Sequence, residues 1–154
     1  MAVSFKEYFE DNEVLLWHFQ GRSMLPLLRE GKDTVVLSRA VPGVRYKKYD
    51  VILYEPSDCG SRRPGYNSYV LHRIVKVLPD SYVVYGDNTY VREVVTDGMI
   101  IASLTGIKRG SKSVSLTSFG YRLYVILNRA SYPVRYLCWI VRKAIARKKN
   151  QGDK

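Results

Sequence analysis

Cysteine is scarce in this sequence and shows no paired spacing. The 154 residues include two cysteines, Cys59 and Cys138, which lie far apart in the chain. A structural zinc site or a redox dithiol uses closely spaced cysteines instead. We therefore expect two free thiols in a reducing compartment, and neither a metal nor another cofactor.

Long apolar runs are also absent. No stretch approaches the roughly 18 consecutive apolar residues that a membrane-spanning helix requires. The first twenty residues carry acidic side chains where a secretory signal would be basic and then apolar; these are Glu7, Glu10, Asp11 and Glu13. No internal repeat or low-complexity segment is visible. These absences predict a cytoplasmic globular protein without a spanning helix.

Acidic residues are scarce in only one part of the chain. Residues 121–154 hold nine basic residues and one acidic residue, whereas residues 1–120 hold sixteen basic and thirteen acidic residues. The net charges are therefore +8 and +3. A strongly basic segment of this kind typically meets an anionic surface. We divide the chain into a nearly balanced body, residues 1–120, and a basic helical appendage, residues 121–154.

The body has the pattern of an all-β domain. Ser4 and Glu7 have the spacing of a capping box, which predicts a short helix over residues 5–12. Downstream, β-branched and aromatic residues fall in short runs between glycine, proline and charged residues, as is typical of short antiparallel strands. The predicted strands cover residues 14–19, 34–37, 51–54, 69–77, 82–85 and 99–108. Residues 55–68 are rich in turn formers and predict an exposed loop.

The periodicity changes at Tyr121. Apolar residues then recur in steps of three and four with basic residues on another side, which predicts a helix over 121–128 and a longer amphipathic helix from about Pro133. Three kinds of partner remain open for this segment. They are an anionic membrane surface bound through residues 133–149, a protein surface such as the body or a second copy in a homodimer, and nucleic acid, which is the least favoured.

Three short motifs carry the candidate chemistry. The segment Gly21–Pro26 presents Ser23 between a flexible glycine and a chain-turning proline, as nucleophiles are often presented. His72 lies in a predicted apolar strand, and histidine is the base best suited to activate a serine near neutral pH. Asp87 lies in a Gly-Asp-Asn motif, where its carboxylate can orient the imidazole and stabilise its charged form.

In this order, the motifs resemble the type I signal peptidases and their S24/S26 relatives. Four blocks carry the resemblance, which covers residues 14–107: Ser-Met-Leu-Pro at 23–26, Asp-Val-Ile-Leu-Tyr at 50–54, Leu-His-Arg-Ile-Val at 71–75 and Tyr-Gly-Asp-Asn at 85–88. The resemblance implies a coiled, barrel-like β body with Ser23 as nucleophile and Asp87 as the acidic partner. His72 stands at the base position, which is lysine in the bacterial branch and histidine in the archaeal and endoplasmic reticulum branch.

The sequence departs from the family pattern at several positions. Gly21 stands where many members have a serine that helps to build the oxyanion hole, so oxyanion stabilisation would depend on backbone amides. The usual Gly-Asp before residue 51 is Tyr49-Asp50 here. For the second acidic residue of the family, Glu93 and Asp97 are poor candidates. The N-terminal membrane anchor of the signal peptidases is missing.

These features predict a serine endopeptidase of the signal peptidase type. Ser23 would attack the peptide bond, His72 would take up the proton and pass it to the leaving amine, and water would hydrolyse the acyl-enzyme. The substrate would be a leader or signal-like peptide of a precursor protein, met in the cytoplasm or at the inner membrane face. The alternative is a catalytically silent binding module that recruits a peptide or membrane partner. A self-cleaving regulator is disfavoured, because no DNA-binding region precedes Ser23.

Overall fold

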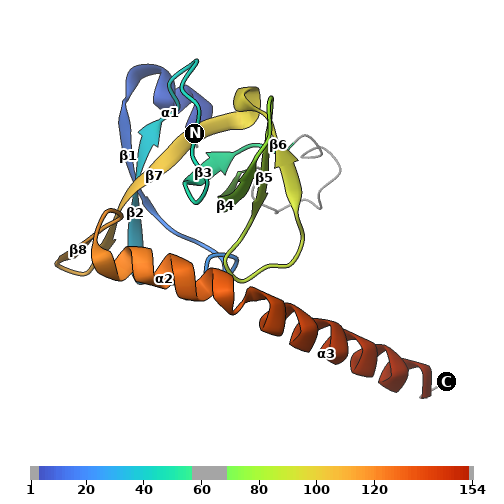
Figure 1. The fold of residues 1–154 in the computed structure, drawn as a ribbon. Helices are drawn as coiled ribbons and strands as arrows, with labels where there is room; N and C mark the ends of the chain where they lie inside the picture. Colours follow the sequence, from blue (N-terminus) through green and yellow to red (C-terminus); the bar gives the residue numbers. More distant parts are fainter. Residues whose placement is uncertain (1–3, 57–68, 153–154) are drawn as a thin grey trace. The chain divides into compact units, whose positions relative to one another are not determined.

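The computed structural model describes residues 4–56 and 69–152, and the chain divides into two compact units between Ser118 and Phe119 (Figure 1). The first unit is built on a β-sheet, and the second consists of two helices. All three predicted catalytic residues belong to the first unit. The predicted exposed loop over residues 55–68 lies almost entirely outside the described residues.

Within the described residues, the first unit contains an open antiparallel sheet of eight strands. Across the sheet the order is β1 (Val14–His18), β2 (Asp33–Arg39), β7 (Ile100–Arg109), β3 (Val51–Tyr54), β4 (Val70–Val77), β5 (Tyr82–Tyr85) and β6 (Glu93–Val95), while β8 (Lys112–Ser115) pairs with β7. The prediction of a mainly antiparallel β body is confirmed. The sheet is curved but does not close into a barrel (Figure 1).

A short helix, α1 (Phe5–Asp11), precedes the sheet and is capped as its sequence predicts. The Ser4 hydroxyl accepts a hydrogen bond from the Glu7 amide at 3.2 Å, and the Glu7 carboxylate accepts one from the Ser4 amide at 2.8 Å. These bonds satisfy two amides that the helix itself leaves without partners. The bond from the Ser4 amide also holds the pKa of Glu7 below its usual range.

Two strands, β6 and β8, were not predicted because their sequences lack a clear strand pattern. β6 has three residues, too few for an alternating pattern to be recognised. β8 is polar and pairs with β7 as a hairpin across Gly110, which has a φ of +59°. The other strands lie within two residues of their predicted limits.

The core of the sheet surrounds β3, which is buried along its whole length. One buried cluster joins this strand to its neighbours β4 and β5 and to the segment 95–100; its members are Ile52, Tyr54, Ile74, Tyr82, Val84, Val95 and Ile100. Tyr54 therefore carries a phenol hydroxyl into an apolar interior. A buried hydroxyl of this kind requires hydrogen-bond partners.

An ion pair fixes the loop between β1 and β2 to the sheet. The Asp33 carboxylate accepts hydrogen bonds from the Arg109 guanidinium at 2.8 and 2.9 Å and from the Arg29 amide at 2.9 Å. Arg109 also donates to the Leu27 carbonyl at 2.9 Å. The hydrogen bond from Arg109 holds the pKa of Asp33 below its usual range. Since folding lowers this pKa, the stabilisation is present at neutral pH and is lost as the pH falls below about 4 through the folded pKa.

The second unit consists of α2 (Phe119–Ala130) and α3 (Tyr132–Gly152), which begin two residues and one residue before their predicted starts. At the junction, the Arg135 guanidinium and the Ser131 hydroxyl donate to the Asn128 carbonyl at 2.8 and 3.1 Å. Neither helix, nor α1, is long and apolar enough in its described residues to cross a membrane. Cys138, on α3, is a free and exposed thiol.

Candidate active site

Ser23 lies in the loop that connects β1 to β2, and its side chain is half-buried. Met24 and Leu28 are fully buried, and the Leu28 amide donates to the Met24 carbonyl at 3.0 Å, so one turn of this loop is anchored in the core. Gly21, on the other side of Ser23, has a φ of +100°, which L side chains rarely adopt. A serine at position 21 would therefore strain the backbone that leads to Ser23.

The backbone of Ser23 is held against the Gly86–Asn88 turn. The Ser23 carbonyl accepts a hydrogen bond from the Asn88 amide at 2.8 Å, and the Asn88 side chain donates to the Arg22 carbonyl at 3.3 Å. A Cβ atom at Gly86 would overlap the Ser23 carbonyl oxygen and lie 3.0 Å from the Ser23 Cβ atom. Only glycine allows this approach, so two motifs more than sixty residues apart form one tight contact.

His72 is buried on β4, opposite Ile52 of β3. Its Nδ1 atom lies 3.1 Å from the Tyr54 hydroxyl, which donates to Glu93 Oε2 at 2.8 Å. A phenol has one proton, and here the proton goes to Glu93, so the Tyr54 oxygen accepts from the protonated Nδ1. The neutral imidazole then has its basic lone pair on Nε2. This tautomer suits a general base.

Asp87 is buried beside Arg73, the residue that follows His72 in β4. The Asp87 carboxylate accepts two hydrogen bonds from the Arg73 guanidinium, at 2.8 and 2.7 Å, and neither side chain is exposed. Arg73 also donates to the Tyr49 carbonyl at 2.9 Å. Successive side chains in a strand point to opposite faces of the sheet, so Arg73 and His72 point in different directions. The role of Asp87 as the acid that orients His72 stays a prediction.

Tyr54 and Glu93 are the residues that sequence reasoning missed as partners of His72. Tyr54 lies two residues beyond Ile52, the cross-strand partner of His72, and therefore shares its face. That relation depends on strand register, which the sequence does not display. Glu93 lies in the short strand β6, while Asp97, the other acidic candidate, accepts hydrogen bonds from Arg45 and Tyr82 at 3.1 and 2.7 Å.

The departure from the family pattern at Tyr49 has a visible backbone consequence. Tyr49 has a φ of +82°, a left-handed conformation that favours glycine. Its amide donates to the Ile74 carbonyl at 2.8 Å, and its carbonyl accepts from Arg73. Both bonds tie this turn to β4, and they hold Tyr49 in its left-handed conformation.

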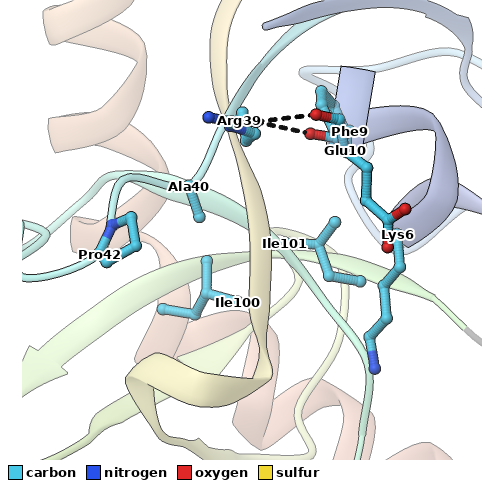
Figure 2. A pocket seen from close by; sticks show the side chains of 8 residues that line it. All are labelled: Lys6, Phe9, Glu10, Arg39, Ala40, Pro42, Ile100 and Ile101. Atoms are coloured by element: carbon cyan, nitrogen blue, oxygen red, sulfur yellow. Dashed lines mark hydrogen bonds between the residues drawn. The ribbon is translucent and has the colours of Figure 1, made fainter. Parts of the chain in front are cut away.

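A separate pocket of about 320 Å³ lies between α1, the end of β2 and the start of β7 (Figure 2). Its lining residues are Lys6, Phe9, Glu10, Arg39, Ala40, Pro42, Ile100 and Ile101. Arg39 points toward the end of α1 and donates to the carbonyls of Phe9 and Glu10 at 3.0 and 3.3 Å. None of the three predicted catalytic residues lines this pocket. Within the described part of the chain, no cluster of histidine, cysteine and acidic residues is suited to hold a metal ion.

Comparison with known protein families finds no matching family model, and comparison with curated proteins finds no match. The resemblance to signal peptidases therefore depends on the four sequence motifs alone. Among the residues that the structure describes, the Ser23 hydroxyl makes no hydrogen bond. Hydrogen bonds of catalytic groups often form only when substrate is bound.

Proposed function

We propose that the protein is a serine endopeptidase of the signal peptidase type, which removes a leader or signal-like peptide from a precursor protein through an acyl-enzyme. Ser23 is the nucleophile and His72 is the general base. The observation that carries this proposal is the close contact of Ser23 with Gly86, because it brings the serine motif to the strand pair that holds the histidine.

The register of β4 and β5 supports the pairing of Ser23 with His72. Arg73 is opposite Tyr85 in this pair, and continuing the register by one residue sets Gly86 opposite His72. Residues directly opposite each other in an antiparallel pair have side chains on the same face. Gly86 has no side chain, and the space in front of it is filled by Ser23. By this argument Ser23 and His72 occupy the same face.

The chain of hydrogen bonds from His72 through Tyr54 to Glu93 supports His72 as the base. When His72 takes the proton of Ser23, the imidazolium gains a link to a carboxylate through the Tyr54 hydroxyl. The carboxylate stabilises this charge and the hydrogen bonds fix the ring, as the acid does in a serine–histidine–acid triad. His72 then returns the proton to the leaving amine, and water hydrolyses the ester.

A fluorophosphonate probe tests the nucleophile directly. We expect one phosphonyl group per chain, located by mass spectrometry on Ser23, because an activated serine reacts with this probe and ordinary surface serines do not. Ser23→Ala is expected to lose both labelling and peptide cleavage. Ser113→Ala, at an exposed serine of β8, is the matched control and should be labelled like the wild type. No labelling of the wild type, or labelling that persists in Ser23→Ala, contradicts the proposal.

Loss of the Glu93 carboxylate is expected to lower kcat/KM about tenfold to a hundredfold, since the imidazolium formed during acylation loses its negative partner. Glu93→Gln removes the charge, and Tyr54→Phe removes the hydroxyl that transmits it. In Glu93→Gln, the acidic limb of the kcat/KM profile is expected to move to lower pH, because imidazolium is less favoured without the carboxylate.

The control for this prediction is Asp97→Asn, which alters the other carboxylate bonded to a tyrosine of the core. Its kcat/KM and pH profile should match those of the wild type. An unchanged rate and profile in Glu93→Gln would contradict the role of Glu93 and leave Asp87 as the acidic partner. If Glu93 had only a structural role, Glu93→Gln would lower the stability of the protein without moving the pH profile of kcat/KM.

A catalytically silent binding module is the second candidate. The absence of a hydrogen bond on the Ser23 hydroxyl, within the described residues, favours it. This candidate predicts that the probe leaves Ser23 unmodified while a leader-like peptide still binds. The labelling experiment therefore separates the two functions.

A further inference from the structure

The helix α2 exposes a continuous apolar stripe. Phe119 is 81% exposed and Ile126 is 63% exposed, and Leu123 and Leu127 lie beside them on the same side of the helix. Their spacing of three and four residues sets them on one face. The buried residues Val125 and Asn128 lie on the other side. Large exposed apolar patches of this kind mark interaction sites.

The helix α3 also exposes aliphatic side chains in a stripe. Val134, Leu137, Val141 and Ile145 recur at three- and four-residue steps and are 48–65% exposed. A different side of the same helix carries a stack of aromatic rings, with Tyr132 6.0 Å from Tyr136 and Tyr136 5.9 Å from Trp139. The Lys143 ammonium lies 4.7 Å from the Trp139 ring.

The charge of these two helices has a single sign. Residues 119–152 contain no aspartate or glutamate and contain eight basic residues, namely Arg122, Arg129, Arg135, Arg142, Lys143, Arg147, Lys148 and Lys149. Exposed aliphatic stripes and positive charge without any acidic residue therefore occur together on the same segment. A surface that fits must offer both hydrocarbon and negative charge.

We propose that α2 and α3 bind an anionic phospholipid surface as interfacial helices. The aliphatic side chains enter the boundary between headgroups and acyl chains, and arginine and lysine contact the lipid phosphates. This inference goes beyond the proposed function and does not depend on whether Ser23 is a nucleophile.

Charge complementarity favours lipid over the other two partners considered for this segment. A second copy would bring one strongly positive segment against another, and this repulsion opposes association. Nucleic acid would match the charge, but its phosphate backbone offers no hydrocarbon for Phe119, Leu123 and Ile126. A bilayer with anionic lipids satisfies both features.

Vesicle co-sedimentation of the full chain tests the proposal. We expect binding to vesicles of phosphatidylcholine with about 30% phosphatidylserine to be at least about tenfold tighter than to pure phosphatidylcholine, and to weaken as salt is raised. The triple variant Arg122→Gln/Arg142→Gln/Lys143→Gln is expected to bind the anionic vesicles about a hundredfold more weakly. The triple variant Lys47→Gln/Lys48→Gln/Lys112→Gln, which changes three exposed lysines of the first unit, is the matched control and should bind normally.

A second pair of variants tests the contribution of the apolar side chains to vesicle binding. Leu123→Ser/Ile126→Ser is expected to lose at least about tenfold in affinity for the anionic vesicles at every salt concentration, because it removes two aliphatic anchors. Val41→Ser/Val44→Ser changes two comparably exposed valines of the first unit and should bind like the wild type. Thermal melting confirms that each variant is folded.

Three results would overturn the proposal. The first is equal binding to neutral and anionic vesicles, or no binding to either, at low salt. The second is a dimer in sedimentation velocity that Leu123→Ser/Ile126→Ser converts to a monomer, which would assign the stripe to a second copy. The third is tighter binding to single-stranded nucleic acid than to anionic vesicles, with no effect of the serine substitutions. Failure of the fluorophosphonate experiment would leave this proposal untouched.

Discussion

Asp87→Asn is expected to destabilise the first unit by about 3–5 kcal/mol, because it leaves the guanidinium of Arg73 buried without its countercharge. Both side chains of this pair are completely buried. Removal of one partner loses the Coulombic attraction while the desolvation cost of the remaining charge stays. Urea denaturation followed by circular dichroism should show a lower midpoint with an unchanged slope.

Two further variants test whether the expected loss of stability comes from the complete burial of the ion pair. In the double variant Arg73→Met/Asp87→Leu, both charges are gone, and most of the lost stability is expected to return. Asp33→Asn removes the carboxylate of the other bidentate pair, but Arg109 is 38% exposed and can be solvated by water. The expected loss there is smaller, about 1–2 kcal/mol.

The substitution Asp87→Asn also distinguishes two roles for the Asp87 carboxylate. A carboxylate that only orients His72 could be replaced by asparagine with full stability and a large loss of activity. A carboxylate that neutralises Arg73 cannot be replaced by asparagine without a loss of stability. Asp87→Asn with wild-type stability and little activity would therefore contradict the structural role and support Asp87 as the acid that orients His72.

The fold was predictable where a short segment contains its own signal. Ser4 and Glu7 carry a complete capping box, and residues 51–54 and 82–85 are unbroken apolar runs, mostly β-branched and aromatic, so α1, β3 and β5 were located well. β8 gave no such signal because its sequence, Lys-Ser-Val-Ser, is polar and becomes a strand only by pairing with β7.

The candidate site was predictable only in part, for a related reason. Ser23 and His72 are chemically conspicuous in short motifs, and the motifs locate them without any knowledge of the fold. The hydrogen bonds of His72 instead depend on which residues the register of β3 and β6 brings to its face, and this selects Tyr54 and Glu93. The pairing of Asp87 with Arg73 likewise depends on the strand geometry of β4, which the motifs do not reveal.

Gly86→Ala is expected to lower kcat/KM by about a hundredfold or more, because the new methyl group would push Ser23 out of position. The Cβ atom would overlap the carbonyl oxygen of Ser23, which is backbone and cannot rotate away as a side chain can. The Asn88 amide also donates a hydrogen bond to that oxygen at 2.8 Å. A movement of the loop that relieved the overlap would therefore break this hydrogen bond. We expect a loss of stability of about 1–3 kcal/mol in addition, as for other overpacked sites.

Gly98→Ala is the matched control, since an added Cβ there has no atom within 4 Å and Gly98 does not have a positive φ. It should keep wild-type activity and stability. In Gly86→Ala, the fluorophosphonate labelling rate should fall together with kcat/KM, because displacement of Ser23 affects attack on any acyl or phosphonyl centre. If the labelling rate is unchanged while stability falls, the contact between Ser23 and Gly86 serves the fold alone. In that case the contact would no longer support the pairing of Ser23 with His72 as nucleophile and base.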